Sequence, residues 1–318
     1  MLFTENLEQI IFSRHNHFRA DELIVLSGYV GPRPIEKLQT LPLTTKVIYG
    51  MYGTEGIQRS LHNSLIELQN RIETLNIFYS NLPVHSKCYV WRNRGEIIHA
   101  LVGSANFSIN GLTTPYREIL AETTLDTFNP LNEYIARVLY NSKSCLEEGI
   151  EVVEPLIVGE TCSLTLLGSN YEVQNAAGLN WGQNPNNHTT PNDAYIKIRV
   201  QDIRNFPGLF PPKQMNPFIA DPRGRIRRHN DAIEIIWDDG ISMEGLLEGS
   251  QEIDGLIYPK QVSSFPVKSE LGEYIRRRIR VPFGQPVRRF HLEAYGRTNI
   301  EVEKIGEGVY KFDFSVNH

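Results

Sequence analysis

The sequence has few of the residues that mark secreted, membrane-spanning or disulfide-rich proteins. Its 318 residues include three cysteines, Cys88, Cys145 and Cys162, and none of them forms a C-x-x-C pair. Neither a zinc ribbon nor a disulfide scaffold is therefore expected. No apolar run approaches the roughly 20 residues that cross a bilayer. The first apolar stretch follows acidic residues, which is the wrong order for a signal peptide. We expect a cytoplasmic protein with no membrane contact.

Motifs for nucleotide and metal binding are also missing. No G-x-x-x-x-G-K-[ST] sequence occurs, so the chain should not bind ATP through a P-loop. No PD-(D/E)xK carboxylate cluster of the magnesium-dependent nucleases stands out. His15 and His17 have no carboxylate cluster near them, which favours plain surface over a metal pair. We expect no cofactor and no metal.

What remains is typical of a globular chain with room for two domains. Hydrophobic residues make up 41% and charged residues 22%. Residues 1–166 alternate strand-like and helix-like runs, which indicates an α/β layer fold. The clearest helix there has one apolar face at three- and four-residue spacing, formed by Ile57, Leu61, Leu65, Leu68 and Ile72.

The second half, residues 167–318, has a different pattern. Residues 167–190 are rich in Asn, Gly and Pro and indicate a linker or an ordered loop. Short strand-like runs separated by turn residues follow, including residues 194–200 and RFHLEAYG at 289–296. Residues 268–279 are the one clear helix candidate. We expect a mostly-β barrel or sandwich, and so a multidomain α/β plus mostly-β protein.

Charge also separates the two halves. Residues 1–166 hold 13 Lys and Arg against 18 Asp and Glu, a net charge of 13 − 18 = −5, whereas residues 167–318 hold 19 of each. Thirteen of the 19 basic residues are Arg, whose planar fork of donors suits phosphates and guanine edges. Solvated surface and an anion-binding face both remain open as interpretations.

Two motifs in the first half contain the residue types of a catalytic site. His85, Lys87 and Tyr89 have the period-two spacing of one strand face, and Gly103-Ser104-Ala105-Asn106 follows the next strand-like run. A hairpin would bring imidazole, ammonium, hydroxyl and amide groups together without a metal. That set suits phosphoryl transfer, with the imidazole as nucleophile and Lys and Asn stabilising charge on oxygen.

The pair of motifs resembles the HxK…GSxN signature of the phospholipase D superfamily. The resemblance implies cleavage of phosphodiesters through a phosphohistidine intermediate. It also implies that Ser104 supports the phosphate pocket and that Glu118, twelve residues past Asn106, orients His85. The superfamily usually has Asp five residues after the Lys, where this chain has Arg92. That departure puts the lipase branch in doubt more than the nuclease branch.

The chain has one such unit, whereas catalysis in the superfamily uses two histidines. One acts as nucleophile and the other as general acid for the leaving oxygen. The resemblance therefore implies a homodimer with a single active site on the two-fold axis.

The second half is similar to the recognition domain of NgoFVII-type restriction endonucleases. These enzymes join a phospholipase D-like nuclease to a B3-like DNA-binding pseudobarrel, and the order of domains agrees. The resemblance implies two arms that grip the major groove of DNA. The candidate base- and phosphate-binding residues are Asn180, Trp181, Gln183, Gln214, Asn216, Arg223, Arg225, Arg228, Tyr274, Arg276, Arg277, Arg278, Arg280 and Gln285.

We expect residues 1–166 to be the nuclease and dimerisation domain and residues 167–318 the DNA-recognition domain. The predicted function is that of a sequence-specific, type II-like restriction endonuclease that cuts double-stranded DNA without metal. A separate helicase subunit and a cognate DNA methyltransferase are further expected partners. One alternative is a site-specific DNA-binding regulator with an inactive nuclease domain. A phospholipid-processing phosphodiesterase is less favoured, because no amphipathic interfacial helix is found.

Overall fold

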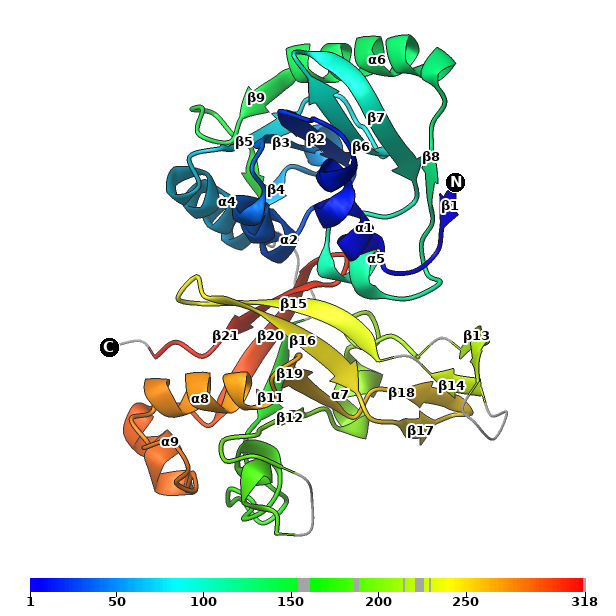
Figure 1. Cartoon of the computed structure of the whole chain (residues 1–318). Helices are drawn as coiled ribbons and strands as arrows, with labels where there is room; N and C mark the ends of the chain where they lie inside the picture. The colour runs from blue at the N-terminus through cyan, green and yellow to red at the C-terminus, as the bar shows by residue number, and fades with distance from the viewer. Residues whose placement is uncertain (154–160, 186–188, 214, 221–225, 229, 317–318) are drawn as a thin grey trace. The chain divides into compact units, whose positions relative to one another are not determined.

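The computed structural model divides into two compact units, Met1–Leu156 and Ile157–His318. Each unit has its own sheet and its own buried core (Figure 1). The described residues are all except 154–160, 186–188, 214, 221–225, 229 and 317–318, and of residues 215–220 and 226–228 only the backbone is described. Within these residues no helix is long and apolar enough to cross a membrane.

The N-terminal unit is built on an eight-stranded sheet with the order β1-β8-β7-β6-β2-β3-β5-β9. Strands β2, β3 and β5 run parallel, whereas β6, β7 and β8 are antiparallel to their neighbours. The strands are β1 Leu2–Phe3, β2 Glu22–Ser27, β3 Thr44–Tyr49, β5 Leu75–Ser80, β6 Lys87–Asn93, β7 Glu96–Gly103, β8 Leu120–Glu122 and β9 Ser142–Ser144. Two short strands, β4 Ile57–Gln58 and β10 Val152–Val153, pair with each other.

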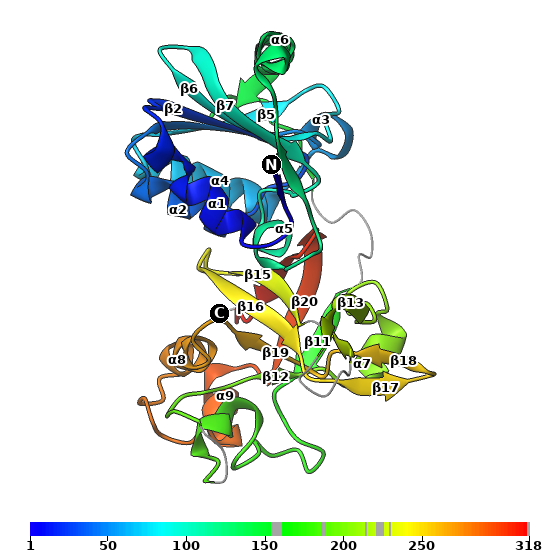
Figure 2. The ribbon, with the colours of Figure 1, turned by 45° about the vertical axis from the view of Figure 1, so that its right-hand side comes forward.

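Helices cover both faces of this sheet, as Figure 2 shows: α1, α2 and α4 lie on one side and α6 on the other. The predicted apolar face of α4 is buried, although the helix itself is shorter than that face. On the opposite side Ile135 and Val138 of α6 pack in one cluster with Ile24 and Leu26 of β2. The helices are α1 Leu7–Ser13, η1 Arg14–His17, α2 Pro32–Lys37, η2 Leu38–Thr40, α3 Tyr52–Glu55, α4 Arg59–Arg71, α5 Ile109–Thr113, η3 Leu125–Thr127 and α6 Phe128–Tyr140. The predicted α/β layers are confirmed.

The C-terminal unit is a seven-stranded sheet with the order β11-β20-β21-β15-β16-β19-β12. Its two edge strands, β11 and β12, approach each other, so the sheet is a nearly closed barrel. The strands are β11 Cys162–Thr165, β12 Ile196–Lys197, β15 Asp231–Trp237, β16 Ser242–Glu248, β19 Gln261–Ser264, β20 Asn299–Gly306 and β21 Val309–Asp313. Two hairpins are added, β13 Met215–Ala220 with β14 Ile226–Arg228 and β17 Gln251–Ile253 with β18 Leu256–Tyr258.

Four helical segments accompany the barrel in the described part of this unit: η4 Gly178–Gln183, α7 Val200–Asn205, α8 Ser269–Arg278 and α9 Arg289–Tyr295. Helix α8 is the predicted one. The predicted strand at 289–296 is wrong, because those residues form α9. His291 Nδ1 accepts a hydrogen bond from the backbone N–H of Arg288 at 2.9 Å, which caps the start of the helix. Gly296 ends it in the left-handed conformation, with φ 104°.

The division between the units falls earlier than the predicted boundary at residue 166. Strand β11 pairs with β20 along its whole length, from Cys162 opposite Val302 to Thr165 opposite Asn299. It therefore belongs to the barrel, and residues 167–185 and 189–190 of the predicted linker are an ordered excursion from that barrel that includes η4.

An ion pair ties α8 to the end of β15. Arg278 Nη2 lies 2.8 Å from Asp238 Oδ2, and both side chains are mostly buried, 18% and 13% exposed. The same guanidinium donates to Tyr274 Oη at 2.7 Å, to Tyr295 Oη at 2.8 Å and to the carbonyl of Phe314 at 3.2 Å. One arginine thus connects helices α8 and α9 with the carboxyl ends of the adjacent parallel strands β15 and β21.

Removing one charge of this pair should destabilise the C-terminal unit. We expect Asp238→Asn to lower its free energy of unfolding by about 2–4 kcal/mol, because a mostly buried cation loses its closer carboxylate and keeps only Asp239, 3.4 Å away. Urea unfolding followed by Trp237 fluorescence measures this, since Trp237 packs on Tyr274. The matched control is Arg204→Met, whose partner Asp254 is 78% exposed, and it should cost less than about 0.5 kcal/mol. Equal effects of the two variants would contradict the stabilising role given to the Arg278–Asp238 ion pair.

Candidate active site and DNA-binding residues

The pairing of β6 with β7 brings the two motifs of the first half together. In the antiparallel register Lys87 lies opposite Gly103, so the turn Gly103-Ser104-Ala105-Asn106 begins beside the His85-x-Lys87 segment. Strand β2 pairs with the other edge of β6, with Leu26 opposite Cys88. The start of β6 and the ends of β2 and β7 therefore lie side by side in the sheet.

His85 and Lys87 differ sharply in exposure. His85 precedes β6 and its side chain is exposed, whereas Lys87 is 5% exposed. Lys87 Nζ lies 3.1 Å from both Nδ1 and Nε2 of His85 and donates to the His85 carbonyl at 2.7 Å. The prediction that the two residues share a strand face with Tyr89 is wrong for His85, which lies outside the strand.

Tyr89 is a structural residue of this site. Its hydroxyl donates to the Ala105 carbonyl at 2.8 Å and is completely buried. Burial raises the pKa of Tyr89 well above its ordinary value, and the nearby Cys88 and Glu118 add to the rise. The phenol therefore stays protonated and holds the Gly-Ser-x-Asn turn against β6.

Asn106 is buried and held by the end of β2. Its Oδ1 accepts the backbone N–H of Tyr29 at 3.2 Å, and the Ser27 hydroxyl donates to the Tyr29 carbonyl at 2.5 Å. The same Ser27 hydroxyl accepts the backbone N–H of Phe107 at 2.9 Å. These contacts set which end of the carboxamide accepts.

Sequence analysis missed the contribution of Gly28 and Tyr29. A Cβ on Gly28 would lie 2.8 Å from His85 Cδ2 and 3.3 Å from Lys87 Nζ, so the glycine leaves the space that the imidazole and the ammonium occupy. The Tyr29 ring lies edge-on to the imidazole at 5.9 Å, and its hydroxyl donates to Glu55 Oε1 at 2.9 Å. The sequence feature that could have indicated these two residues is a strand-like run that ends in Ser-Gly-Tyr.

Ser104 joins the turn to the segment that carries Glu118. The Ser104 N–H donates to the Ile119 carbonyl at 3.0 Å, and the Ile119 N–H donates to Ser104 Oγ at 3.1 Å. Glu118 lies just before β8 and is half-buried, with Arg117 Nε 3.6 Å from its Oε1. Glu122, four residues further along the chain, pairs with Arg14 and with the amino group of Met1.

Arg92, which stands where the superfamily usually has Asp, lies at the other end of β6. It is opposite Glu22 of β2 and forms an ion pair with that carboxylate at 3.4 Å. It also donates to Asn132 of α6. Five residues of strand separate it from Lys87, about 16 Å. Arg92 therefore acts on the packing of α6 and does not contact the His85 cluster.

Several predicted DNA-binding residues are buried. Asn180 is 0% exposed, and its carboxamide exchanges hydrogen bonds with Val287, at 2.8 Å to the carbonyl and 2.7 Å from the N–H. Arg276 is 1% exposed and donates to the carbonyls of Leu179, Gly272 and Gln285. Tyr274 and Arg278 belong to the Asp238 ion-pair cluster. These four side chains hold the loops and helices of the barrel, and contact of any of them with DNA stays a prediction.

Other predicted residues are accessible. Arg277, Arg280 and Gln285 are exposed at the end of α8 and in the segment after it. Trp181 and Gln183 of η4 are half-buried, and Gln183 Nε2 donates to the Gly284 carbonyl at 2.9 Å. Gln214, Arg223 and Arg225 lie outside the described residues. Asn216 and Arg228 lie on β13 and β14, whose side chains are not described.

Across the described parts of the chain no group of three His, Cys, Asp or Glu side chains could hold an ion. His15 and His17 belong to η1, and no carboxylate pair completes a site with them. The three cysteines are free and buried.

Comparisons with known proteins cover both units. A family model described as the NgoFVII restriction endonuclease N-terminal PLD domain matches residues 5–153, and one described as the NgoFVII C-terminal B3-like DNA-binding domain matches residues 158–306. No curated protein matches the chain.

Solved structures match the N-terminal unit. NucT from Helicobacter pylori is 17% identical with a TM-score of 0.32, and the match covers 43% of this chain and 87% of that one. Nuc from Salmonella typhimurium, a phospholipase D family member, is 12% identical with a TM-score of 0.33 and the same coverage. The family models carry the fold assignment: a PLD-like first domain and a B3-like second domain.

The turn after β7 depends on a glycine. A Cβ on Gly103 would lie 2.0 Å from the Ile119 carbonyl oxygen. We expect Gly103→Ala to lower the free energy of unfolding by about 1–3 kcal/mol, because β8 must move away. Chemical denaturation followed by circular dichroism checks this. The control is Gly306→Ala, where the nearest atom, Val309 Cβ, is 3.6 Å away. A Gly103→Ala protein as stable as this control would refute the close approach.

Proposed function

We propose that this chain, which belongs to the NgoFVII restriction endonuclease family, cuts double-stranded DNA at a specific sequence through a phosphohistidine intermediate and without a metal ion. The observation that carries the proposal is the register of β6 and β7, with Lys87 opposite Gly103. In support, the exposed His85 imidazole lies 3.1 Å from the buried Lys87 ammonium, and the turn that carries Asn106 begins opposite Lys87. Such a set supplies a nucleophile and two charge stabilisers.

In the proposed first step a nitrogen of His85 attacks phosphorus, a P–N bond forms, and the P–O bond to one deoxyribose breaks. His85 of the partner subunit gives its proton to the leaving oxygen. Water then attacks phosphorus and passes a proton back to the partner's His85. The P–N bond breaks, so the imidazole is restored and a phosphomonoester is released. Protons and bonds balance over the two steps.

The other residues act on the phosphate or on the imidazole. Lys87 Nζ and the amide N–H of Asn106 bind non-bridging oxygens, and Gly28 gives those oxygens room to approach. Ser104 fixes the turn through its two hydrogen bonds with Ile119. Glu118, on the neighbouring segment, orients a histidine of the assembled site.

Support for a metal-independent mechanism comes from the donor set. A cationic nitrogen, Lys87 Nζ, lies within 3.1 Å of both ring nitrogens of His85. The same ammonium supplies the positive charge that a metal otherwise provides at a phosphoryl group.

Recognition is assigned to the exposed part of the C-terminal unit. We infer that Arg277, Arg280 and Gln285 contact DNA, with Trp181 and Gln183 at the border of the same surface. The buried Asn180 and Arg276 hold this surface in place, because both bond to the backbone of its loops. A helicase subunit and a DNA methyltransferase remain expected partners of the system.

His85→Ala should abolish cleavage. Purified protein is incubated with unmethylated plasmid in EDTA, with and without added magnesium. Wild type should give discrete fragments in EDTA, and His85→Ala should be slower by more than about 10³-fold, because one residue supplies both nucleophile and acid. The exposed His17→Ala is the matched control. Cleavage that EDTA stops, or that survives His85→Ala, rules the mechanism out.

Site-specific binding without any cleavage, unchanged by His85→Ala, would favour the alternative function, a DNA-binding regulator. A gel-shift selection on random duplex DNA separates this outcome from a protein that needs a missing subunit.

The proposed site uses a second histidine from a partner chain, and exposed apolar residues lie on the segments next to the two motifs. Leu82, Ile119 and Tyr134 are 39%, 46% and 37% exposed. Leu82 lies three residues before His85, Ile119 bonds to Ser104, and Tyr134 Oη lies 2.8 Å from Ser86 Oγ. We propose that a second copy of the chain covers them, which brings the partner's His85 to the same phosphate.

An acidic residue on this surface should separate the subunits. We expect wild type to sediment at twice the 36.4 kDa chain mass and Ile119→Glu to sediment as a monomer that does not cut plasmid, because a carboxylate would be buried in the interface. The control is Leu256→Glu, at an exposed position on the β17–β18 hairpin, which should remain a dimer. A monomeric wild type that cuts DNA would refute the shared site.

A further inference from the structure

Strand β12 has one apolar face and one polar face. Ile196 and Ile198 are 1% and 0% exposed and belong to the core of the C-terminal unit. The residues that alternate with them in the sequence, Tyr195, Lys197 and Arg199, line a pocket together with Ile196. An aromatic ring and two cations therefore stand in a row on one edge of the barrel.

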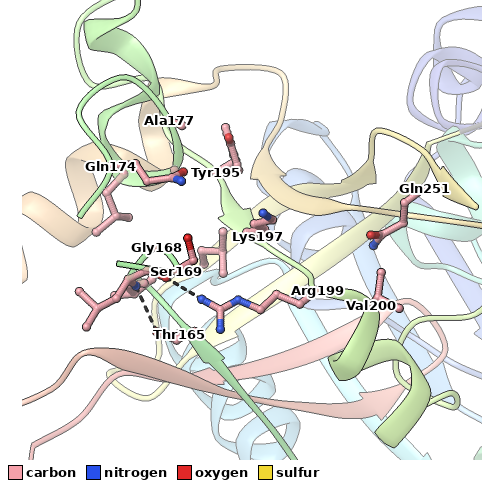
Figure 3. Close-up of a pocket in the computed structure, with 15 residues that line it drawn as sticks. Thr165, Gly168, Ser169, Gln174, Ala177, Tyr195, Lys197, Arg199, Val200 and Gln251 are labelled. Carbon is pink, nitrogen blue, oxygen red and sulfur yellow. Dashed lines mark hydrogen bonds between the residues drawn. The ribbon is translucent and has the colours of Figure 1, made fainter. Parts of the chain in front are cut away.

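This row forms one wall of a pocket of about 420 Å³ (Figure 3). The pocket lies at the seam of the barrel, between the end of β11 at Thr165 and β12 at Ile196 and Lys197. Both are edge strands, so each has one side whose backbone groups are not paired within the sheet. Its volume is in the range of small-molecule sites.

The charge of the pocket is of one sign. Its described lining residues include Lys197 and Arg199 and no Asp or Glu. The Arg199 guanidinium extends toward the Gly168–Ser169 turn, where Nη2 donates to the Leu167 carbonyl at 2.7 Å (Figure 3). This bond holds one cation in place across the seam. The positive charge of its lining therefore favours binding of an anion.

The remaining wall is polar and neutral. Gln174, Ser169 and Gln251 place amide and hydroxyl groups around the pocket (Figure 3). The Gln251 amide is anchored, because Nε2 donates to the carbonyls of Ile198 at 3.1 Å and Pro259 at 2.9 Å. The Tyr195 ring is braced by Trp181, edge-on at 5.7 Å. Amides can read the edge of a base, and the ring can stack on its face.

We propose that this pocket binds a single nucleotide, with its phosphate at Lys197 and Arg199 and its base beside Tyr195 and Gln174. The nucleotide is either free or a unit of bound DNA that has left the stack, since both have the same chemistry. The pocket is separate from the His85 cluster, which belongs to the other unit, and the inference does not require cleavage.

Trp181 provides a local signal for the test. The other two tryptophans, Trp91 and Trp237, are 0% and 1% exposed, so quenching by a ligand reports on Trp181. The full chain is titrated with the four deoxynucleoside monophosphates, and with inorganic phosphate and deoxyadenosine as probes of each half. We expect saturable quenching by at least one monophosphate, and weaker binding of phosphate or nucleoside alone.

Lys197→Met removes the exposed cation while leaving the Arg199 bond in place. It should weaken monophosphate binding about tenfold, the low end for a hydrogen bond to a charged group. The matched control is Lys304→Met, at an exposed position of β20 outside the lining, which should bind as wild type does. Absence of saturable binding, equal binding by Lys197→Met, or phosphate binding as strong as that of the nucleotide would each overturn the proposal.

A second arm distinguishes the two sources. His85→Ala protein is mixed with duplexes that carry 2-aminopurine at successive positions of the cleaved sequence. A fluorescence rise at one position, lost in the His85→Ala, Lys197→Met double variant, identifies a nucleotide extruded from DNA. Unchanged fluorescence together with monophosphate binding identifies a free nucleotide. A wild type that cuts no plasmid would count against the proposed function and leave the titration unaffected.

Discussion

The chemistry of the N-terminal unit depends on the register of one strand pair. Because Lys87 lies opposite Gly103, the residues that enter β6 and the residues that leave β7 meet at one end of the sheet. A shift by one residue would turn every side chain of β6 to the other face of the sheet. Lys87 would then leave the site, and Tyr89 would lose its bond to Ala105. The buried phenol of Tyr89 and the Ser104–Ile119 bonds oppose that shift from two sides.

In the C-terminal unit several charged residues serve the fold. Arg276 is buried among carbonyl oxygens of three segments, and burial lowers the pKa of its guanidinium. Arginine still keeps its charge, because its ordinary pKa lies so far above neutrality. The hydrogen bonds offset part of the cost of desolvation. An arginine-rich segment thus divides into side chains that fix loops and neighbours, such as Arg277, that reach solvent.

The sequence predicted most of the fold and the centre of the site. Alternating strand and helix signals indicated the first unit, and the two spaced motifs indicated which residues meet. The prediction from sequence was wrong where one local pattern is compatible with both a strand and a helix. RFHLEAYG alternates like a strand, yet a cap at Arg288 and a stop at Gly296 make it helical. The sequence could not predict that Asn180 and Arg276 are buried. Their hydrogen-bond partners include backbone carbonyls that lie about a hundred residues away in the sequence. Gly28 acts through space that only the folded chain defines.

The exposure of the site residues bears on why the proposed cleavage would need two chains. Lys87 and Asn106 are buried and held by the strands around them, as suits groups that only need to present charge. His85 is exposed, braced on one side by Gly28 and Tyr29. An in-line displacement needs groups on both sides of phosphorus, and the described part of one chain places its only HxK imidazole on one side. If His85 is the nucleophile, as proposed, a symmetric partner would complete the site, because the same surface then supplies the opposite side.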